Sequence, residues 1–245
     1  MFFAKIKATF FHGLVTLSIA AICGYVVFFI WYPDKLAEIA AGADLYILVL
    51  IGEITLGPLL TFVIFNANKS VKELVVDYCL IGLVQLSALG YGLYSVALSR
   101  PVYLVFVKDR IEVVAATELS TSDLADAGLS PSTLPWWGPE FVCTESPDDF
   151  AERSELLMSA LKGRDIQLIP KYYRECGATE VADGMYDYTL LKQVQGFEES
   201  FASASIDEAA AGWLPVVTRF GAWLAVYPEK QVDNPIYLNL NPFVH

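Results

Sequence analysis

The stretch LYILVLIGEITLGPLLTFVIF, residues Leu45–Phe65, decides the fold of the amino-terminal part of this chain. It is apolar over about the 20 residues that a helix needs to cross the hydrocarbon core of a bilayer. It holds one acidic side chain, Glu53, and the pair Gly57-Pro58. An acid inside a membrane usually faces protein or water, and a proline bends a helix unless neighbours compensate. The stretch therefore predicts a membrane helix that packs against other helices.

Two further apolar runs flank this helix. Ala8–Tyr32 is longer than the apolar core of a signal peptide, which spans about 7–15 residues, so we expect a retained anchor. Tyr78–Leu98 carries Gln85 and several small residues, which let helices approach closely. The helix–helix face that these small residues predict consists of Gly82, Ser87, Ala88, Gly90 and Gly92.

Glu53 and Gln85 are expected at similar depths in the membrane. At a rise of 1.5 Å per residue, Glu53 lies about 14 Å from one membrane face and Gln85 about 12 Å from the other. Both are then near the middle of a core about 30 Å thick. His12 is expected near the membrane surface, which leaves Gln85 as the only polar partner at that depth. Apolar surroundings disfavour a charged carboxylate, so a neutral Glu53 can donate a hydrogen bond to the Gln85 amide.

The basic residues predict an orientation. Those before the first span and between the second and third are Lys5, Lys7, Lys69 and Lys72. The loop on the other side of the membrane holds only Lys35. The positive-inside rule then places the amino terminus in the cytoplasm. We expect residues 1–99 to form a three-helix transmembrane domain, and residues 100–245 to form a domain on the far side of the membrane, which in a bacterium is the periplasm.

The expected periplasmic domain is acidic and has an α+β pattern. Residues 99–245 contain 22 acidic and 11 basic side chains, which argues against binding to nucleic acid and against docking on anionic lipid. Strands are clustered at both ends of the domain with helices between them. The predicted strands are Val102–Val107, Ile111–Ala115, Phe141–Cys143, Leu214–Arg219, Ala222–Tyr227 and Ile236–Leu240. The predicted helices are Ser120–Ala127, a helix capped by Ser146 that ends near Lys162 and buries Phe150, Leu156, Leu157 and Leu161, and Asp187–Phe201.

The four cysteines fall into two pairs. Cys23 and Cys79 differ in membrane depth by more than the roughly 7 Å between Cα atoms that a disulfide allows, so both should be free. Cys143 and Cys176 lie in the same exported domain, where an oxidising compartment permits a disulfide. Their spacing alone does not decide whether they pair.

The sequence contains no recognisable catalytic constellation. The two histidines, His12 and His245, are far apart, and neither metal-ligand spacing nor a phosphate-binding loop nor a nucleophile elbow is present. The pair Trp136-Trp137 is more typical of packing in a core or at a membrane interface than of a binding surface. The residues alone therefore predict no metal site and no cofactor, and they leave the function open.

Six segments recur together in a known family. They are Leu50–Phe65, Lys69–Leu74, Gln85–Ser95, Arg100–Phe106, Leu134–Pro139 and Asp165–Tyr173. In this order and at these distances they resemble the type IV pilin accessory proteins of the TfpX/TfpZ family. That family usually has a Val-Asp pair in the region Gly-x-x-x-x-Leu-Gly-Pro-Leu-Leu-Thr, whereas here the acid is Glu53, next to Gly52. This departure keeps a carboxyl group, and we expect it to move the carboxyl to a helix face one residue away.

The resemblance implies an inner-membrane accessory protein, or chaperone, that helps a type IV pilin become an assembled pilus, and it implies no enzymatic activity. Its expected partners are the pilin, the lipid bilayer and other pilus-assembly membrane proteins. Pilins of this class carry an acid and a free amino terminus at the start of their membrane helix, so Glu53 can receive that amine or bond that acid. The candidate residues for pilin contact or helix packing are Glu53, Gly57, Pro58, Gln85, Gly90 and Gly92.

Two other functions remain open from the residues alone. One is a small membrane enzyme or transporter that uses Glu53, which would need a second polar group along a path through the bundle. The other is a scaffold subunit of a different envelope complex.

Overall fold

The computed structural model describes residues 2–66, 68–177, 179–194, 211–228 and 234–243. It divides into two compact units, Met1–Arg100 and Pro101–His245. Three helices of the first unit are long and apolar enough to cross a membrane, and they cover Phe2–Trp31, Gly42–Ile64 and Val71–Leu98. The chain is thus a membrane protein with a carboxy-terminal soluble domain, and the predicted fold class is confirmed.

The first span begins earlier than the sequence analysis predicted. Helix α1 covers Phe2–Val26 and continues as a π-helical segment, η1, over Val27–Trp31. The lysines near its start do not delay the helix, because long basic side chains keep their charge in water while their stems lie along apolar surface. The Lys5 ammonium lies 5.8 Å from the centre of the Phe62 ring, which is such an arrangement.

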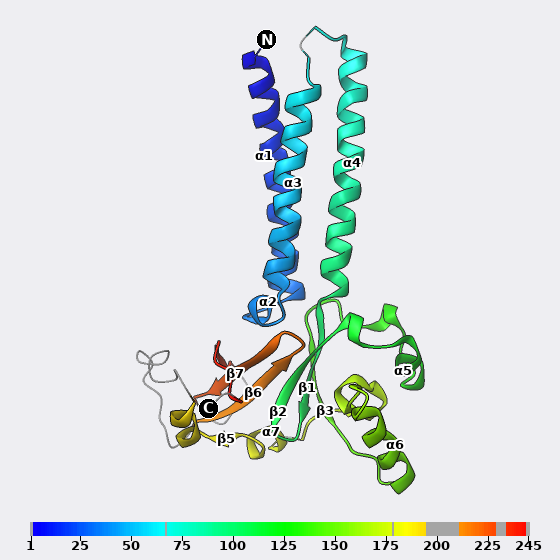
Figure 1. Cartoon of the computed structure of the whole chain (residues 1–245), viewed down its shortest axis with the longest axis vertical. Coiled ribbons are helices and arrows are strands. Elements are labelled where there is room, and N and C mark those ends of the chain that lie inside the picture. The colour runs from blue at the N-terminus through cyan, green and yellow to red at the C-terminus, as the bar shows by residue number, and fades with distance from the viewer. Residues whose placement is uncertain (1, 67, 178, 195–210, 229–233, 244–245) are drawn as a thin grey trace. The chain divides into compact units, whose positions relative to one another are not determined.

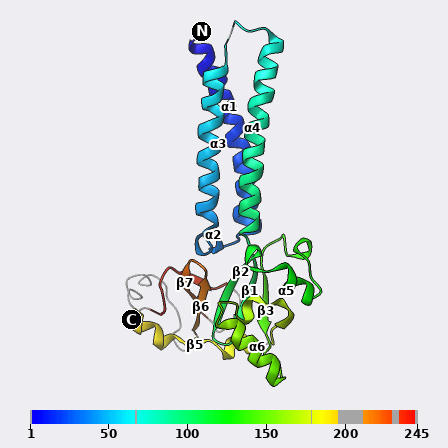
Figure 2. The same ribbon diagram turned by 45° about the vertical axis from the view of Figure 1, so that its right-hand side comes forward.

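The other two spans also extend beyond the predicted bounds at their starts. Helix α3 covers Gly42–Ile64, and a short helix, α2 (Leu36–Ile39), precedes it. Helix α4 covers Val71–Leu98 and begins well before the predicted Tyr78, because Ser70 and Glu73 form a capping box: the Ser70 N–H donates to Glu73 Oε2 at 2.7 Å. In both views of this unit α3 lies alongside α1 and α4 (Figures 1 and 2). Pro58 lies inside α3, which remains helical to Ile64.

The second unit is built on one mixed sheet. In the described residues its strands are β1 (Pro101–Val107), β2 (Arg110–Ala115), β3 (Glu140–Thr144), β4 (Tyr173–Arg174), β5 (Tyr186–Asp187), β6 (Gly212–Thr218), β7 (Gly221–Tyr227) and β8 (Ile236–Leu238). Their order is β4-β3-β1-β2-β6-β7-β8, and β5 pairs with β6. The pairs β1–β3 and β2–β6 are parallel, and the other pairs are antiparallel. Each predicted strand overlaps an observed one.

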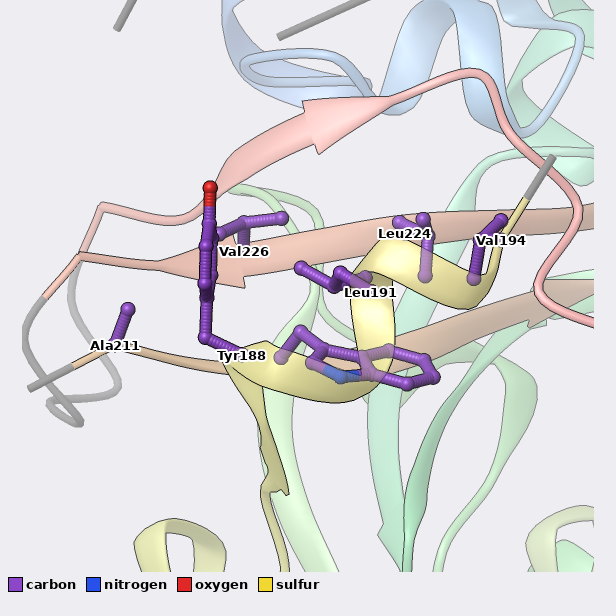
Figure 3. Packing of buried hydrophobic residues seen from close by; sticks show 7 residues of the cluster. Tyr188, Leu191, Val194, Ala211, Leu224 and Val226 are labelled. Carbon is purple, nitrogen blue, oxygen red and sulfur yellow. The ribbon is translucent and has the colours of Figure 1, made fainter. Parts of the chain in front are cut away.

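Short helices connect these strands. They are η2 (Ala116–Glu118), α5 (Thr121–Asp126), η3 (Pro131–Thr133), α6 (Phe150–Ala160), η4 (Ile166–Leu168), η5 (Pro170–Tyr172), α7 (Glu180–Asp183) and η6 (Tyr188–Gln193). The predicted helix over Asp187–Phe201 is wrong in its described part, which is the end of β5 followed by the 3₁₀ segment η6; residues 195–201 lie outside the described ranges. Figure 3 shows Tyr188, Leu191 and Val194 packed against Leu224 and Val226 of β7, and this tertiary packing replaces regular helix formation.

Helix α6 differs from the prediction in its start and in its burial. Its cap is Asp149, which accepts a hydrogen bond from the Glu152 N–H at 2.9 Å, so the helix begins at Phe150 and not after Ser146. Phe150, Leu157 and Leu161 are exposed and do not form a buried face. Helical spacing identified the apolar side chains, but the fold does not cover that face within the described residues.

The cysteines of the two units are in different states. Cys143 of β3 and Cys176, just after β4, form a disulfide with their Cα atoms 5.0 Å apart. The antiparallel pairing of β3 with β4 brings them together, since Cys143 lies opposite Arg174. Cys23 and Cys79 are free.

Candidate functional site

A cluster of polar side chains joins the three membrane helices. His12 and Thr16 come from α1, Glu53 and Thr61 from α3, and Gln85 from α4. His12 Nδ1 lies 2.5 Å from Thr61 Oγ1, and His12 Nε2 lies 2.8 Å from Gln85 Oε1. The Gln85 amide nitrogen donates to Thr16 Oγ1 at 3.1 Å and to the main-chain oxygen of Glu53 at 3.4 Å. Gln85 is therefore the centre of a network that links all three spans.

The main-chain oxygen of Glu53 fixes the direction of these hydrogen bonds. A carbonyl oxygen can only accept, so the Gln85 nitrogen must face it and the Gln85 oxygen must face His12. His12 Nε2 must then carry a proton and donate it to Gln85. In the neutral imidazole the other nitrogen, Nδ1, accepts a hydrogen bond from the Thr61 hydroxyl.

The Glu53 carboxyl group shares the Gln85 amide with two other acceptors. The side chain is 6% exposed, and the Gln85 amide interacts with it as well as with Thr16 and the Glu53 main chain. One amide supplies two N–H groups, so three acceptors compete for two donors. A further donor brought by a ligand would therefore find an acceptor here.

The cluster borders a cavity of about 200 Å³ between the three spans. Its lining is mostly apolar, with a few polar groups. The lining residues are His12, Val15, Thr16, Ile19, Ala20, Tyr46, Val49, Leu50, Glu53, Gly82, Gln85, Leu86 and Leu89. Pockets for drug-sized ligands usually measure about 300–1,000 Å³, so this one fits a side chain or a chain end better than a separate small molecule.

Two glycines allow close packing around the cluster. A Cβ at Gly57 would lie 2.6 Å from Oε1 and 2.7 Å from Cδ of Gln85, so only glycine leaves room for that amide. A Cβ at Gly92 would lie 2.8 Å from both terminal carbons of Val49. A Cβ at Gly90 or Gly82, in contrast, would meet nothing within 4 Å. The predicted face of small residues on α4 thus makes a close helix contact at Gly92 but not at Gly90.

The soluble unit contains a larger groove, of about 610 Å³, between α6 and the β1–β2 hairpin. Glu112 of β2 lines it, together with Lys108, Arg153 and Leu156. Burial raises the pKa of the Glu112 carboxyl above its usual range, and the nearby Arg110 opposes this shift. In the described ranges no group of three His, Cys, Asp or Glu side chains is placed to hold a metal ion, in either unit.

Comparison with known proteins gives the family. The family model for the fimbrial assembly protein FimB matches residues 1–40, which include His12 and Thr16. The "Fimbrial assembly protein, serogroup I" of Dichelobacter nodosus is 31% identical over 239 residues, which is 94% of this chain and 92% of that protein. The chain belongs to the fimbrial assembly protein family.

Further relatives in this family come from the same organism. The "Fimbrial assembly protein, serogroup E1" is 29% identical over 239 residues, again 94% of this chain and 92% of the relative. The "Fimbrial assembly protein, serogroups C1 and C2" is 37% identical over 127 residues, which is 52% of this chain and 95% of that relative. No solved structure matches the chain.

The polar cluster of this fimbrial assembly family member includes residues that the sequence alone did not predict. Gln85 is not the only polar partner near Glu53, and His12 is not confined to the membrane surface, because α1 begins at Phe2 and places His12 about 15 Å along it. The sequence does contain a spacing that indicates these polar helix faces. His12 and Thr16 are four residues apart, as are Gly57 and Thr61, and residues four apart share a helix face.

Gly57→Ala is expected to lower the amount of folded protein in the membrane. The added methyl group overlaps the Gln85 amide, so either the network or the α3–α4 packing must open, and overpacking of this kind typically costs about 1–3 kcal/mol. Gly90→Ala is the matched control, since it adds the same methyl group in a membrane helix where nothing lies within 4 Å. The temperature at which each variant aggregates in detergent measures the difference in stability between them. Equal stability of both variants would contradict the observed packing.

Proposed function

We propose that this protein is a non-enzymatic accessory protein, or chaperone, that holds a type IV pilin subunit in the bacterial inner membrane before pilus assembly. Membership of the fimbrial assembly family supports a role in assembly. The observation that carries the finer proposal is the cavity between the spans, where the Glu53 carboxyl group competes with other acceptors for donors.

The chemistry of the cavity supports a pilin chain end as its occupant. A pilin of the class named by the resemblance brings an apolar helix that starts with a free amine. An ammonium group within a bilayer is costly unless it meets an acid, and the Glu53 carboxyl group is such an acid. The apolar remainder of the lining, including Leu50 and Leu89, would cover the first side chains of that helix.

The soluble unit offers a second contact, which we assign to the pilin head. Helix α6 exposes Phe150, Leu157 and Met158, and its C-cap residue Leu161 is exposed as well. These positions recur at helical spacing beside the groove lined by Leu156. Exposed apolar patches on soluble domains commonly mark protein interaction sites. Two contacts, one on the helix and one on the head, would suit a client that has both parts.

The proposed client also sets the orientation, since a pilin head lies in the periplasm. Alkaline phosphatase fused after His245 should be active, and a fusion within residues 66–70 should be inactive. The lysine asymmetry and the three spans support this arrangement. Phosphatase activity only in the second fusion would reverse the topology and remove the head contact.

Co-purification tests the proposal as a whole. Affinity-tagged full-length protein, extracted from pilus-forming cells in mild detergent, should recover the pilin. An unrelated tagged inner-membrane protein at equal expression is the control and should not. Recovery of other envelope proteins without pilin would favour the scaffold function, and transport or turnover of a small molecule by the purified protein would favour the membrane enzyme or transporter.

A further inference from the structure

One end of the sheet in the soluble unit carries exposed aromatic side chains. Strands β1 and β3 are parallel, with Tyr103 opposite Glu140, so the residues just before Glu140 lie at the end where β1 begins. These residues include Trp136 and Trp137, and Trp137 is 85% exposed. The start of β1 and the two tryptophans therefore share one end of the sheet.

The turn between β6 and β7 lies at the same end. Strand β2 runs antiparallel to β1, and β6 runs parallel to β2, so β6 ends where β1 begins. This turn presents Phe220, which is 56% exposed, with the Arg219 guanidinium 4.7 Å from the centre of its ring. Arg219 Nη1 also lies 3.5 Å from Thr117 Oγ1, just beyond the end of β2. This contact fixes the turn to the same end of the sheet.

The chain limits how far the start of β1 can lie from the end of the third membrane span. Helix α4 ends at Leu98, and β1 begins at Pro101. Three residues of fully extended chain reach at most about 11 Å. The start of β1 is therefore within about 11 Å of the end of a membrane span, whatever the orientation of the domain.

The composition of this end differs from that of the acidic domain around it. Residues 127–139, which lead into β3, include no charged side chain, and the β6–β7 turn supplies the cation of Arg219. The acidic side chains of Glu118, just after β2, and Glu140, the first residue of β3, also lie at this end. Tryptophan and arginine beside apolar rings are typical of the boundary between lipid head groups and acyl chains. The remaining acidic surface would be repelled by anionic lipid, which leaves this end as the favoured contact.

We propose that Trp137 and Phe220 insert into the bilayer at the head-group boundary and hold the soluble domain on the membrane surface. The ligand is the lipid surface itself, and Arg219 would meet the lipid phosphates. This inference does not depend on the identity of the client or on the proposed chaperone role.

Fluorine NMR of the full-length protein in lipid nanodiscs tests the proposal. The chain has five tryptophans, so 5-fluorotryptophan labelling gives a small set of signals, and Trp137→Phe identifies the signal of Trp137. We expect nanodiscs that contain lipid with a nitroxide near the head group to abolish the Trp137 signal, and a water-soluble gadolinium chelate to leave it. Trp213, which is buried in the domain core, should keep its signal under both conditions.

Two added probes provide a matched comparison. Phe243 is 54% exposed and lies 5.8 Å from the Arg110 guanidinium, so it repeats the Phe–Arg arrangement of the β6–β7 turn. Arg110 follows the turn after β1, at the opposite end of the sheet. The signal of Phe220→Trp should be lost with the nitroxide lipid, and that of Phe243→Trp with the gadolinium chelate.

Any other pattern at Trp137 and Phe220→Trp overturns the proposal. If the gadolinium chelate alone abolishes these fluorine signals, this end of the sheet is open to water and available to a protein partner. If the signals persist with both agents, a second copy of the chain covers this end of the sheet.

Discussion

Glu53→Ala is expected to leave the amount of this protein in the membrane nearly unchanged while it removes most surface pili. The alanine variant keeps the main-chain oxygen that accepts from Gln85, so the bonds among His12, Thr61 and Gln85 remain. It removes the carboxyl group that would meet the pilin amine. An uncompensated charge at mid-membrane costs about 2.5–3.5 kcal/mol, which corresponds to roughly 100-fold weaker binding. Immunoblots of membranes and counts of pili by electron microscopy measure the two effects.

Gln85→Ala is the control that separates binding from packing. It removes the acceptor for His12 Nε2 and the donor for the buried Thr16 hydroxyl, so both side chains lose a hydrogen-bond partner inside the bundle. It should therefore lower the level of the protein itself, and pili should decline with that level. If Glu53→Ala also lowers the protein level, the carboxyl group serves packing. Normal pili in Glu53→Ala cells would contradict the binding role.

The second large effect is expected from the disulfide. The double variant Cys143→Ser/Cys176→Ser opens a loop with a sequence separation of 33, which in the chain-entropy model costs about 3–4 kcal/mol of the free energy of unfolding. Such a loss should make the soluble unit sensitive to protease at lower temperature in intact membranes. Cys23→Ser/Cys79→Ser is the matched control, since those two thiols are free.

Thiol counting on the unfolded wild-type protein gives an independent measure of the same bond. Two reactive thiols are expected before reduction and four after it. Four thiols before reduction would mean that Cys143 and Cys176 do not pair.

The membrane spans and strands could be read from the sequence because local patterns determine them. A run such as Leu45–Phe65 has to be helical in a bilayer, and the apolar run Val102–Val107 between turn residues predicts β1. Helix ends were less accurate, since the capping box of Ser70 and Glu73 extends α4 beyond its apolar part. The pairing of Cys143 with Cys176 could not be decided from spacing, because it depends on how β3 and β4 meet.

The candidate site could be predicted only in part for the same reason. Glu53 and Gln85 stand out as polar residues in apolar runs, but their partners depend on how each helix is rotated about its axis. His12 joins the cluster because α1 starts at Phe2 and the helix face that carries His12 is turned toward α3. The apolar residues of α6 present the opposite case, since helical spacing suggests a buried face and the fold leaves Leu157 exposed.

The most direct test of pilin binding in the cavity is photo-crosslinking from two positions on α4 in living cells. Leu86 lines the cavity and is 62% exposed, whereas Val84 does not line it, is 53% exposed and points roughly 200° away around the helix. A photoreactive phenylalanine analogue at Leu86 should give an adduct that antibodies against the pilin detect, and the same analogue at Val84 should not. Pilin adducts of equal yield at both positions, or none at Leu86 in cells that assemble normal pili, would contradict binding in this cavity.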